Sequence, residues 1–242
     1  RSHGLVLTAT GEILLEPAKE MQRAAAKLSL VAEGHGNSLS GIVRITASAL
    51  VSHYHLPKIL ADIKLAEPDI ELELYPSDTT KNLLFREAGI AVRMFRSEQL
   101  DVIMRHIGGM QIGMFASKEY VARRGVPTDS KNVMQHDFVG FNDNDKIIVE
   151  MRKFGLDVDR NFFKIRCDDQ VANWQLARAG CGIGFAQVSI GQADADMVQV
   201  LSDIPLPILP MWLTAPEALR TNPRIRRVFD LLADALGSVV DA

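Results

Sequence analysis

Polar side chains suited to binding a small ligand recur where the predicted strands end. In α/β sheets, ligands bind beyond the carboxyl ends of the strands, where helix N-termini present free amide hydrogens and a partial positive charge. Hydroxyl, amide and carboxylate groups stand at several such positions, although each could instead cap the helix that it precedes. The candidate ligand-binding residues are Ser48, Ser52, Ser77, Asp78, Thr79, Arg93, Asn142, Asp168 and Gln187.

Two charged members of this set determine the expected ligand chemistry. The planar guanidinium of Arg93, at a strand end, could clamp a carboxylate, or it could pair with Glu87 or Asp101 at the surface. Asp168 would bring an acceptor-only carboxylate from the opposite side, which an amine or several hydroxyls of the ligand would satisfy. We therefore expect a small polar acid or a zwitterion. If Asp168 caps its own helix instead, the pocket would suit a plain carboxylic acid.

Residue patterns typical of enzymes and metal sites are missing from the sequence. It contains no P-loop, no G-x-S-x-G nucleophile elbow and no H-E-x-x-H motif. The glycine-rich residues 180–184 follow a predicted helix and enter a strand, the reverse of the order in a dinucleotide site, which favours a tight turn. His53 and His55 would lie on different helix faces, which argues against zinc. We expect no catalytic residue, no cofactor and no metal.

Charge and composition restrict the classes of partner. The formal net charge of −3 and the pI near 6.1 lack the basic character of a DNA-binding domain. No apolar run is long enough for a membrane span and no leader is visible, so we expect a cytoplasmic location. Cys167 and Cys181 are the only cysteines, and two buried thiols are a better interpretation than a redox pair.

Short apolar runs and helical segments alternate along the chain and would position the candidate residues. This alternation predicts an α/β fold with crossover helices. The predicted strands are 42–47, 70–75, 90–92, 102–107, 111–115, 138–141, 147–151, 163–167, 183–186 and 211–214. The predicted helices are 52–65, 79–88, 117–124, 169–179 and 223–236.

A further helix is predicted over residues 12–33, with Thr8 as its cap. Its apolar residues repeat at alternating four- and three-residue spacing, which is typical of a helix that pairs with another helix but also of one packed on its own domain. Pro17 implies that the helix either begins near Glu16 or bends there. Residues 34–41 then form a linker. The seam residues are Leu14, Ala18, Met21, Ala25, Leu28 and Ala32.

Several segments, taken in order, carry a family resemblance. The first eleven residues follow the pattern R-x-x-G-L-x-L-T-x-x-G, and they resemble the end of the winged helix-turn-helix of LysR-type transcriptional regulators. The segments SGIVRITAS, IELELYPSD, GIAVR and ARAGCGIGFAQ resemble successive parts of that family's effector domain. This chain departs from the family pattern at Glu87 and Gly89, at Asp168, and at Gln187, which stands where proline is usual.

The resemblance implies two Rossmann-like lobes of the type 2 periplasmic-binding-protein fold, joined by crossover strands. Residues 1–11 would be a wing remnant and 12–35 a linker and dimerisation helix. Lobe I would comprise 41–113 with 215–242, and lobe II 114–214. The implied function is sensing of a small effector between the lobes by a regulator that forms a homodimer or homotetramer and contacts DNA through a domain preceding Arg1. The alternatives are a free-standing periplasmic-type solute-binding protein and a two-lobe enzyme.

Overall fold

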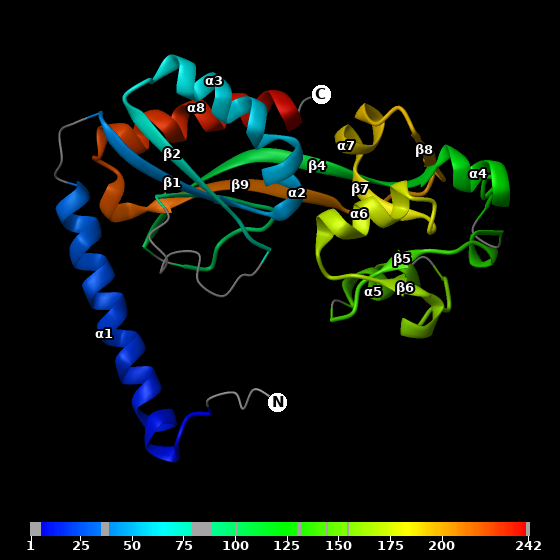
Figure 1. The fold of residues 1–242 in the computed structure, drawn as a ribbon, viewed down its shortest axis with the longest axis horizontal. Helices are drawn as coiled ribbons and strands as arrows, with labels where there is room; N and C mark the ends of the chain where they lie inside the picture. Colours follow the sequence, from blue (N-terminus) through cyan, green and yellow to red (C-terminus); the bar gives the residue numbers. More distant parts are fainter. Residues whose placement is uncertain are drawn as a thin grey trace.

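Strands and helices alternate along the chain in the computed structural model, which describes residues 6–34, 39–78, 89–99, 101–129, 132–143, 145–153 and 155–240 (Figure 1). The predicted α/β fold is confirmed. The first elements are α1 (Ala9–Gly34), β1 (Gly41–Ala47), α2 (Ala49–Tyr54), α3 (Leu56–Ala66), β2 (Ile70–Pro76), β3 (Ile90–Arg93), β4 (Val102–Ser117) and α4 (Lys118–Arg124). The predicted helix at 79–88 lies outside the described residues.

The second half of the chain returns to β4 through shorter elements. They are η1 (Asn132–Gln135), β5 (Val139–Gly140), α5 (Lys146–Lys153), η2 (Arg160–Phe162), β6 (Ile165–Arg166), α6 (Gln170–Arg178), β7 (Gly184–Gln187), α7 (Val188–Ala193), β8 (Met197–Val200), β9 (Ile208–Pro216), η3 (Glu217–Leu219) and α8 (Pro223–Val240). The sequence did not predict α7 and β8.

One seven-stranded sheet links both halves of the molecule. Its order is β2-β1-β3-β9-β4-β7, and β8 also pairs with β4. β1 pairs in parallel with β2 and β3, whereas β9 and β4 form a long antiparallel pair. β5 and β6 form a separate two-stranded sheet. Figure 1 shows β4 and β9 passing from one half of the molecule to the other.

The apolar residues gather in separate cores on the two halves. The first core packs β1 and β3 against α3 and α8, with Ile45, Leu56 and Val228 among its fully buried side chains. The second core lies between β4 and the β5–α5 region and contains Phe138 and Phe163. Leu50, Phe115 and Trp174 belong to a third cluster, through which α2 contacts the second half. Burial of these side chains supplies most of the favourable free energy of folding.

Two sequence predictions about strands are wrong. Residues 147–151 belong to helix α5, in which Ile148 and Met151 are buried and Val149 is exposed. Their β-branched residues favoured a strand, but spacing of three between buried positions is helical. The predicted strands 102–107 and 111–115 are a single strand, because β4 absorbs its two central glycines through a register shift between His106 and Gly108.

The predicted helix at 52–65 is also wrong in extent, because it is two helices. α2 ends and α3 begins at His55, whose φ of −109° departs from regular helix. Pro57, in the first turn of α3, has no amide hydrogen to donate to the preceding turn. This break separates the short α2 from α3 and leaves α2 free to contact the second half of the molecule.

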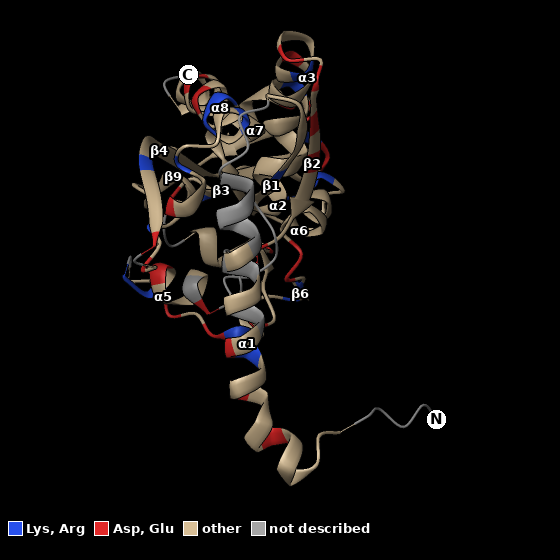
Figure 2. Cartoon of the chain, turned by 90° about the vertical axis from the view of Figure 1, so that its left-hand side faces the viewer, with Lys and Arg blue, Asp and Glu red and all other residues tan. Residues whose placement is uncertain are grey.

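Helix α1 extends away from the sheets, and it is longer than predicted. Its N-terminus is capped by Thr8, whose Oγ1 accepts a hydrogen bond from the Gly11 amide at 3.1 Å. The helix continues through Pro17. The helix contacts η3. Figures 1 and 2 show that it projects outward from the body. Within the described residues, no helix is long and apolar enough to cross a membrane.

Candidate functional site

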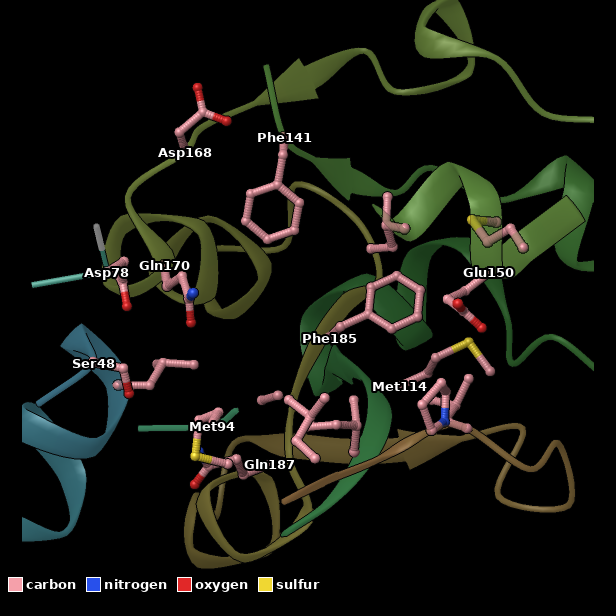
Figure 3. Close-up of a pocket in the computed structure, with 18 of the residues that line it drawn as sticks. Ser48, Asp78, Met94, Met114, Phe141, Glu150, Asp168, Gln170, Phe185 and Gln187 are labelled. Atoms are coloured by element: carbon pink, nitrogen blue, oxygen red, sulfur yellow. The ribbon is translucent and has the colours of Figure 1, made fainter. Parts of the chain in front are cut away.

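A cavity of about 660 Å³ lies where the ends of β1, β2 and β3 face the second core. Its volume is in the range of small-molecule sites in proteins. Figure 3 shows Ser48, Asp78 and Gln170 on one side of this cavity and Met114, Phe185 and Glu150 on the other. The structure brings six predicted residues together in its wall: Ser48, Ser77, Asp78, Arg93, Asp168 and Gln187.

Arg93 is a buried cation in the cavity wall. It is 5% exposed, and its guanidinium donates to Val92 O at 3.0 Å and to Thr46 Oγ1 at 2.9 Å. Among the described residues, no carboxylate lies within ion-pair distance of it. Loss of solvent lowers the pKa of Arg93 to about 10, although the charge of Asp78 opposes this shift. The side chain remains charged at neutral pH and has N–H donors to spare.

Asp78, rather than Ser48, caps helix α2. Ser48 precedes α2, but its side chain makes no capping hydrogen bond. Instead, Asp78 Oδ1 accepts from the Ala49 amide at 3.1 Å. Desolvation raises the pKa of the Asp78 carboxyl, and the Ala49 amide and Arg93 act in the opposite direction. The Ser48 hydroxyl is therefore available to a molecule in the cavity.

Asp168 serves a loop rather than its own helix. Its Oδ1 accepts from the backbone amides of Asn142 and Asp143 at 2.7 and 3.0 Å. Asp169 is the residue that caps α6, by accepting from the Ala172 amide at 2.7 Å. In Figure 3, the Asp168 carboxylate points away from Ser48. Two backbone amides therefore already donate to Oδ1 of the carboxylate that we expected to bind an amine of the ligand.

Two further predicted residues, Ser52 and Asn142, do not line the cavity. Ser52 is 3% exposed and its hydroxyl turns back to donate to Ala47 O at 3.3 Å, a bond that satisfies the strand end. Asn142 contributes its backbone amide to Asp168, and its side chain is not in the cavity wall. Thr79 lies outside the described residues, as does Glu87, one of the surface partners considered for Arg93.

Gln187 connects the cavity to α2. It is 3% exposed, and its Oε1 accepts from His55 Nε2 at 2.6 Å. Nearby, Gln175 Nε2 donates to the Tyr54 hydroxyl at 3.1 Å. These two bonds join the end of α2 to β7 and α6. The Gln187 amide nitrogen is left to donate to a ligand.

We expect His55 to make folding less favourable in mild acid. Burial lowers the pKa of His55 below 6.5, while the bond to Gln187 raises it by a smaller amount. The unfolded chain therefore binds a proton at a higher pH than the folded chain, and the free energy of unfolding falls as pH drops below about 6.5. Denaturation of the wild type and of His55→Gln between pH 5 and 7.5 measures this. Equal pH dependence in both proteins contradicts it, and His53→Gln is the control.

Sequence reasoning missed the apolar part of the site. The wall opposite Ser48 and Asp78 consists of side chains at the edge of the second core. The aromatic residues concentrated between 138 and 163, together with Phe185, were the available signal, but such residues are more often simple core. The apolar lining residues of this part are Met114, Val133, Phe138, Ile147, Met151, Leu156, Phe185, Ile204 and Leu206.

The described part of the chain shows neither a metal-binding cluster nor a disulfide. No group of three or more His, Cys, Asp or Glu there could hold a metal ion. Cys167 and Cys181 are free and only partly buried, rather than fully buried as predicted. Residues 180–184 form the predicted turn between α6 and β7, with Gly180 at φ +79°.

Comparisons with known proteins agree with this architecture. The family model described as "LysR substrate binding domain" matches residues 36–237. The Mau operon transcriptional activator of Paracoccus denitrificans is 27% identical over 91% of this chain and 74% of its own length. The regulatory domain of CrgA, a LysR-type transcriptional regulator from Neisseria meningitidis, superposes with a TM-score of 0.69 at 21% identity, covering 81% of this chain and 99% of that one.

Full-length CrgA gives a TM-score of 0.70 at 21% identity and covers 98% of this chain and 82% of its own. Full-length AphB of Vibrio cholerae gives 0.70 at 19% identity, covering 97% and 82%. These likenesses confirm the periplasmic-binding-protein-like fold of LysR regulatory domains. They favour a transcriptional regulator over a solute-binding protein. Because the family model spans most of its length, the chain belongs to the LysR substrate-binding domain family.

Proposed function

We propose that this effector-binding domain of a LysR-type transcriptional regulator binds a small carboxylic acid in its cavity, with Arg93 as the main anchor. The observation that carries the proposal is the buried guanidinium, which has no carboxylate partner among the described residues and lies in the cavity wall. Burial of this charge is costly, Asp78 acts on it only from beyond ion-pair distance, and a ligand carboxylate would relieve the remaining cost. Ser48 and Gln187 would add neutral donors from the two sides.

Between a zwitterion and a plain acid, the contacts of Asp168 favour the plain acid. An amine of the ligand would have to bind Asp168 through Oδ2, because two backbone amides already donate to Oδ1. It would also have to approach a carboxylate that points away from Ser48 (Figure 3). The other carboxylates of the described cavity wall are Asp78, which caps α2, Glu150, which pairs with Lys153, and Asp143.

Calorimetric titration tests the proposal. Butanoate, butylamine and γ-aminobutyrate have similar sizes and differ in charge, and all three are titrated into the protein at pH 7. We expect the acid to bind at least ten-fold more tightly than the amine, since only the acid can pair with Arg93. Tighter binding of the amine, or binding of none of these compounds at millimolar concentration, would contradict the proposal.

Asp168→Asn separates the two ligand classes directly. The asparagine retains an oxygen for the amides of residues 142 and 143 but has no charge, so we expect butanoate to bind as well as before or slightly better. If Asp168 instead binds an amine, γ-aminobutyrate should lose about 1.5–3 kcal/mol of binding free energy. Calorimetry on both variants and the wild type decides between these outcomes, with Asp169→Asn as the matched control.

We also propose the division into lobes 41–113 with 215–242 and 114–214, and self-association through α1. The separate first and second cores support the division. The seam residues Leu14, Met21 and Leu28 support self-association, because they are 57%, 76% and 74% exposed on a helix that projects from the body. Such a stripe is buried when a second helix packs on it. In this proposal, a change between the lobes reaches the DNA-binding domains through α1.

A further inference from the structure

We propose that the acid bound at Arg93 carries an unbranched or aromatic hydrocarbon tail, which lies in the apolar part of the cavity, and that it has no second charged group. This inference rests on the proposed function, since it takes the carboxylate end from it. It adds the chemical class of the rest of the molecule, and it replaces the polar body that the sequence predicts. The site would then select amphipathic monocarboxylic acids.

The first argument is the chemistry of the far wall, here called the apolar chamber and defined by Met114, Phe138, Ile147, Met151, Leu156, Phe185, Ile204 and Leu206. These residues come from four separate parts of the chain, on β4, β5, α5 and the stretch around β7 to β9. None of them offers a hydroxylated ligand a strong side-chain donor or acceptor, since the methionine sulfurs are only weak acceptors. A polar body placed here would lose its bonds to water without replacement.

The second argument is continuity. The chamber and the polar end around Arg93, Ser48 and Gln187 line one cavity, so a single molecule can touch both. Figure 3 shows Phe141 and Phe185 between the polar side and Glu150. A ligand with its carboxylate at Arg93 therefore directs its other end toward the second core.

The third argument is the cost of such a chamber to the fold. Protein interiors are close-packed, and apolar space beside a core forfeits dispersion contacts. Phe138 and Met151 are 1% and 5% exposed and belong to the second core. Apolar cavities in proteins can bind hydrocarbon ligands. The chamber is accordingly a place where a hydrocarbon group improves the packing.

The far wall of the cavity, which includes Glu150, favours a ligand that has a single charged group. It is the acidic residue of α5 in the cavity wall, and its Oε1 pairs with Lys153 Nζ at 2.7 Å. Because Lys153 already forms an ion pair with Glu150, this carboxylate attracts a cationic tail of the ligand only weakly. A second carboxylate on the ligand would meet apolar side chains, because Arg93 is the only Lys or Arg in the described cavity wall. Dicarboxylates of matched length should therefore bind poorly.

The experiment is a calorimetric series with acetate, butanoate and hexanoate, together with adipate and 1-hexanol. Burial of each methylene contributes about 0.8 kcal/mol, so each pair of methylenes should tighten binding roughly ten-fold. Adipate should bind at least ten-fold more weakly than hexanoate. Equal affinities for acetate and hexanoate, or tighter binding of adipate, would overturn the inference.

Leu206→Trp tests the location of the tail. Leu206 lies on the partly exposed loop before β9, where a larger side chain can be accommodated while it fills the chamber. We expect hexanoate to bind at least ten-fold more weakly to this variant and acetate to change less than two-fold. Val126→Trp is the control, since Val126 is 49% exposed on another loop and does not line the cavity. Hexanoate affinity that is unchanged in Leu206→Trp would contradict the tail site.

The two proposals fail in different ways. If short acids bind through Arg93 but chain length has no effect, the proposed function stands and the apolar chamber is not a ligand site. If 1-hexanol binds as tightly as hexanoate, and both lose affinity in Leu206→Trp, the chamber binds hydrocarbon but Arg93 does not select an acid. That result overturns the amphipathic-acid inference and the proposed function while leaving the chamber itself.

Discussion

Replacement of Arg93 by methionine is expected to weaken binding of hexanoate by about 10- to 150-fold. A charge-assisted hydrogen bond contributes about 1.5–3 kcal/mol, and methionine keeps a long side chain while removing every donor. Because the pKa of Arg93 is about 10, the loss should be the same at pH 6 and pH 8. Calorimetry at both values measures it, and denaturation checks that the variant folds.

Two further variants make this result specific. Arg93→Lys keeps the charge but loses the planar fork, so it should bind hexanoate with intermediate affinity. Arg96→Met is the matched control, because the Arg96 guanidinium lies over the Trp212 ring, 5.7 Å from its centroid, and does not line the cavity. If Arg93→Met binds hexanoate as well as the wild type does, the acid is held elsewhere and the proposed function is wrong.

Glutamate at Leu14, Met21 and Leu28 together is expected to convert a dimer into a monomer. Full burial of each such side chain contributes about 1.5–3 kcal/mol, and every dimer would bury two copies of each. The dissociation constant should therefore rise by several orders of magnitude. Sedimentation velocity at micromolar protein concentration measures the change.

Leu65→Glu is the control for added charge on an exposed leucine, since Leu65 is 82% exposed on α3, away from the seam. We expect it to leave the oligomer intact. A wild-type protein that sediments as a monomer would contradict self-association. A triple variant that remains a dimer would place the contact on another surface.

The fold was largely predictable from the local sequence pattern, and the errors in the prediction arise where contacts remote in sequence decide the structure. Apolar runs bounded by turn residues gave β1, β2 and α8 within a few residues. The misassigned α5 combines β-branched residues with helical spacing, and only its packing on the second core decides between them. The glycines of β4 indicated a break, but Gly108 is needed because a Cβ there would meet the Val240 side chain of α8. Such a contact is remote in sequence.

The candidate site was predictable at its polar end only. Positions after strands led to Ser48, Ser77 and Asp78, because the carboxyl ends of neighbouring strands meet in any α/β sheet. The capping of α2 by Asp78 rather than by Ser48 could not be predicted, since it depends on β2 lying beside β1. The apolar chamber depends on how α5 and the loop before β9 come together. The roles of the polar end and of the apolar chamber in ligand binding stay predictions.

The pairing of β9 with β4 has a mechanical consequence for this domain. Arg93 is paired with Trp212 on β9, which in turn pairs with His106 on β4, while Gln187 is paired with Ile112 of β4. A ligand that touches both Arg93 and Gln187 would therefore clamp two points of one ribbon. The register shift lies between them, where a bulged strand twists most readily. Relative movement of the two halves would then be a torsion of this ribbon rather than a swing about a loop.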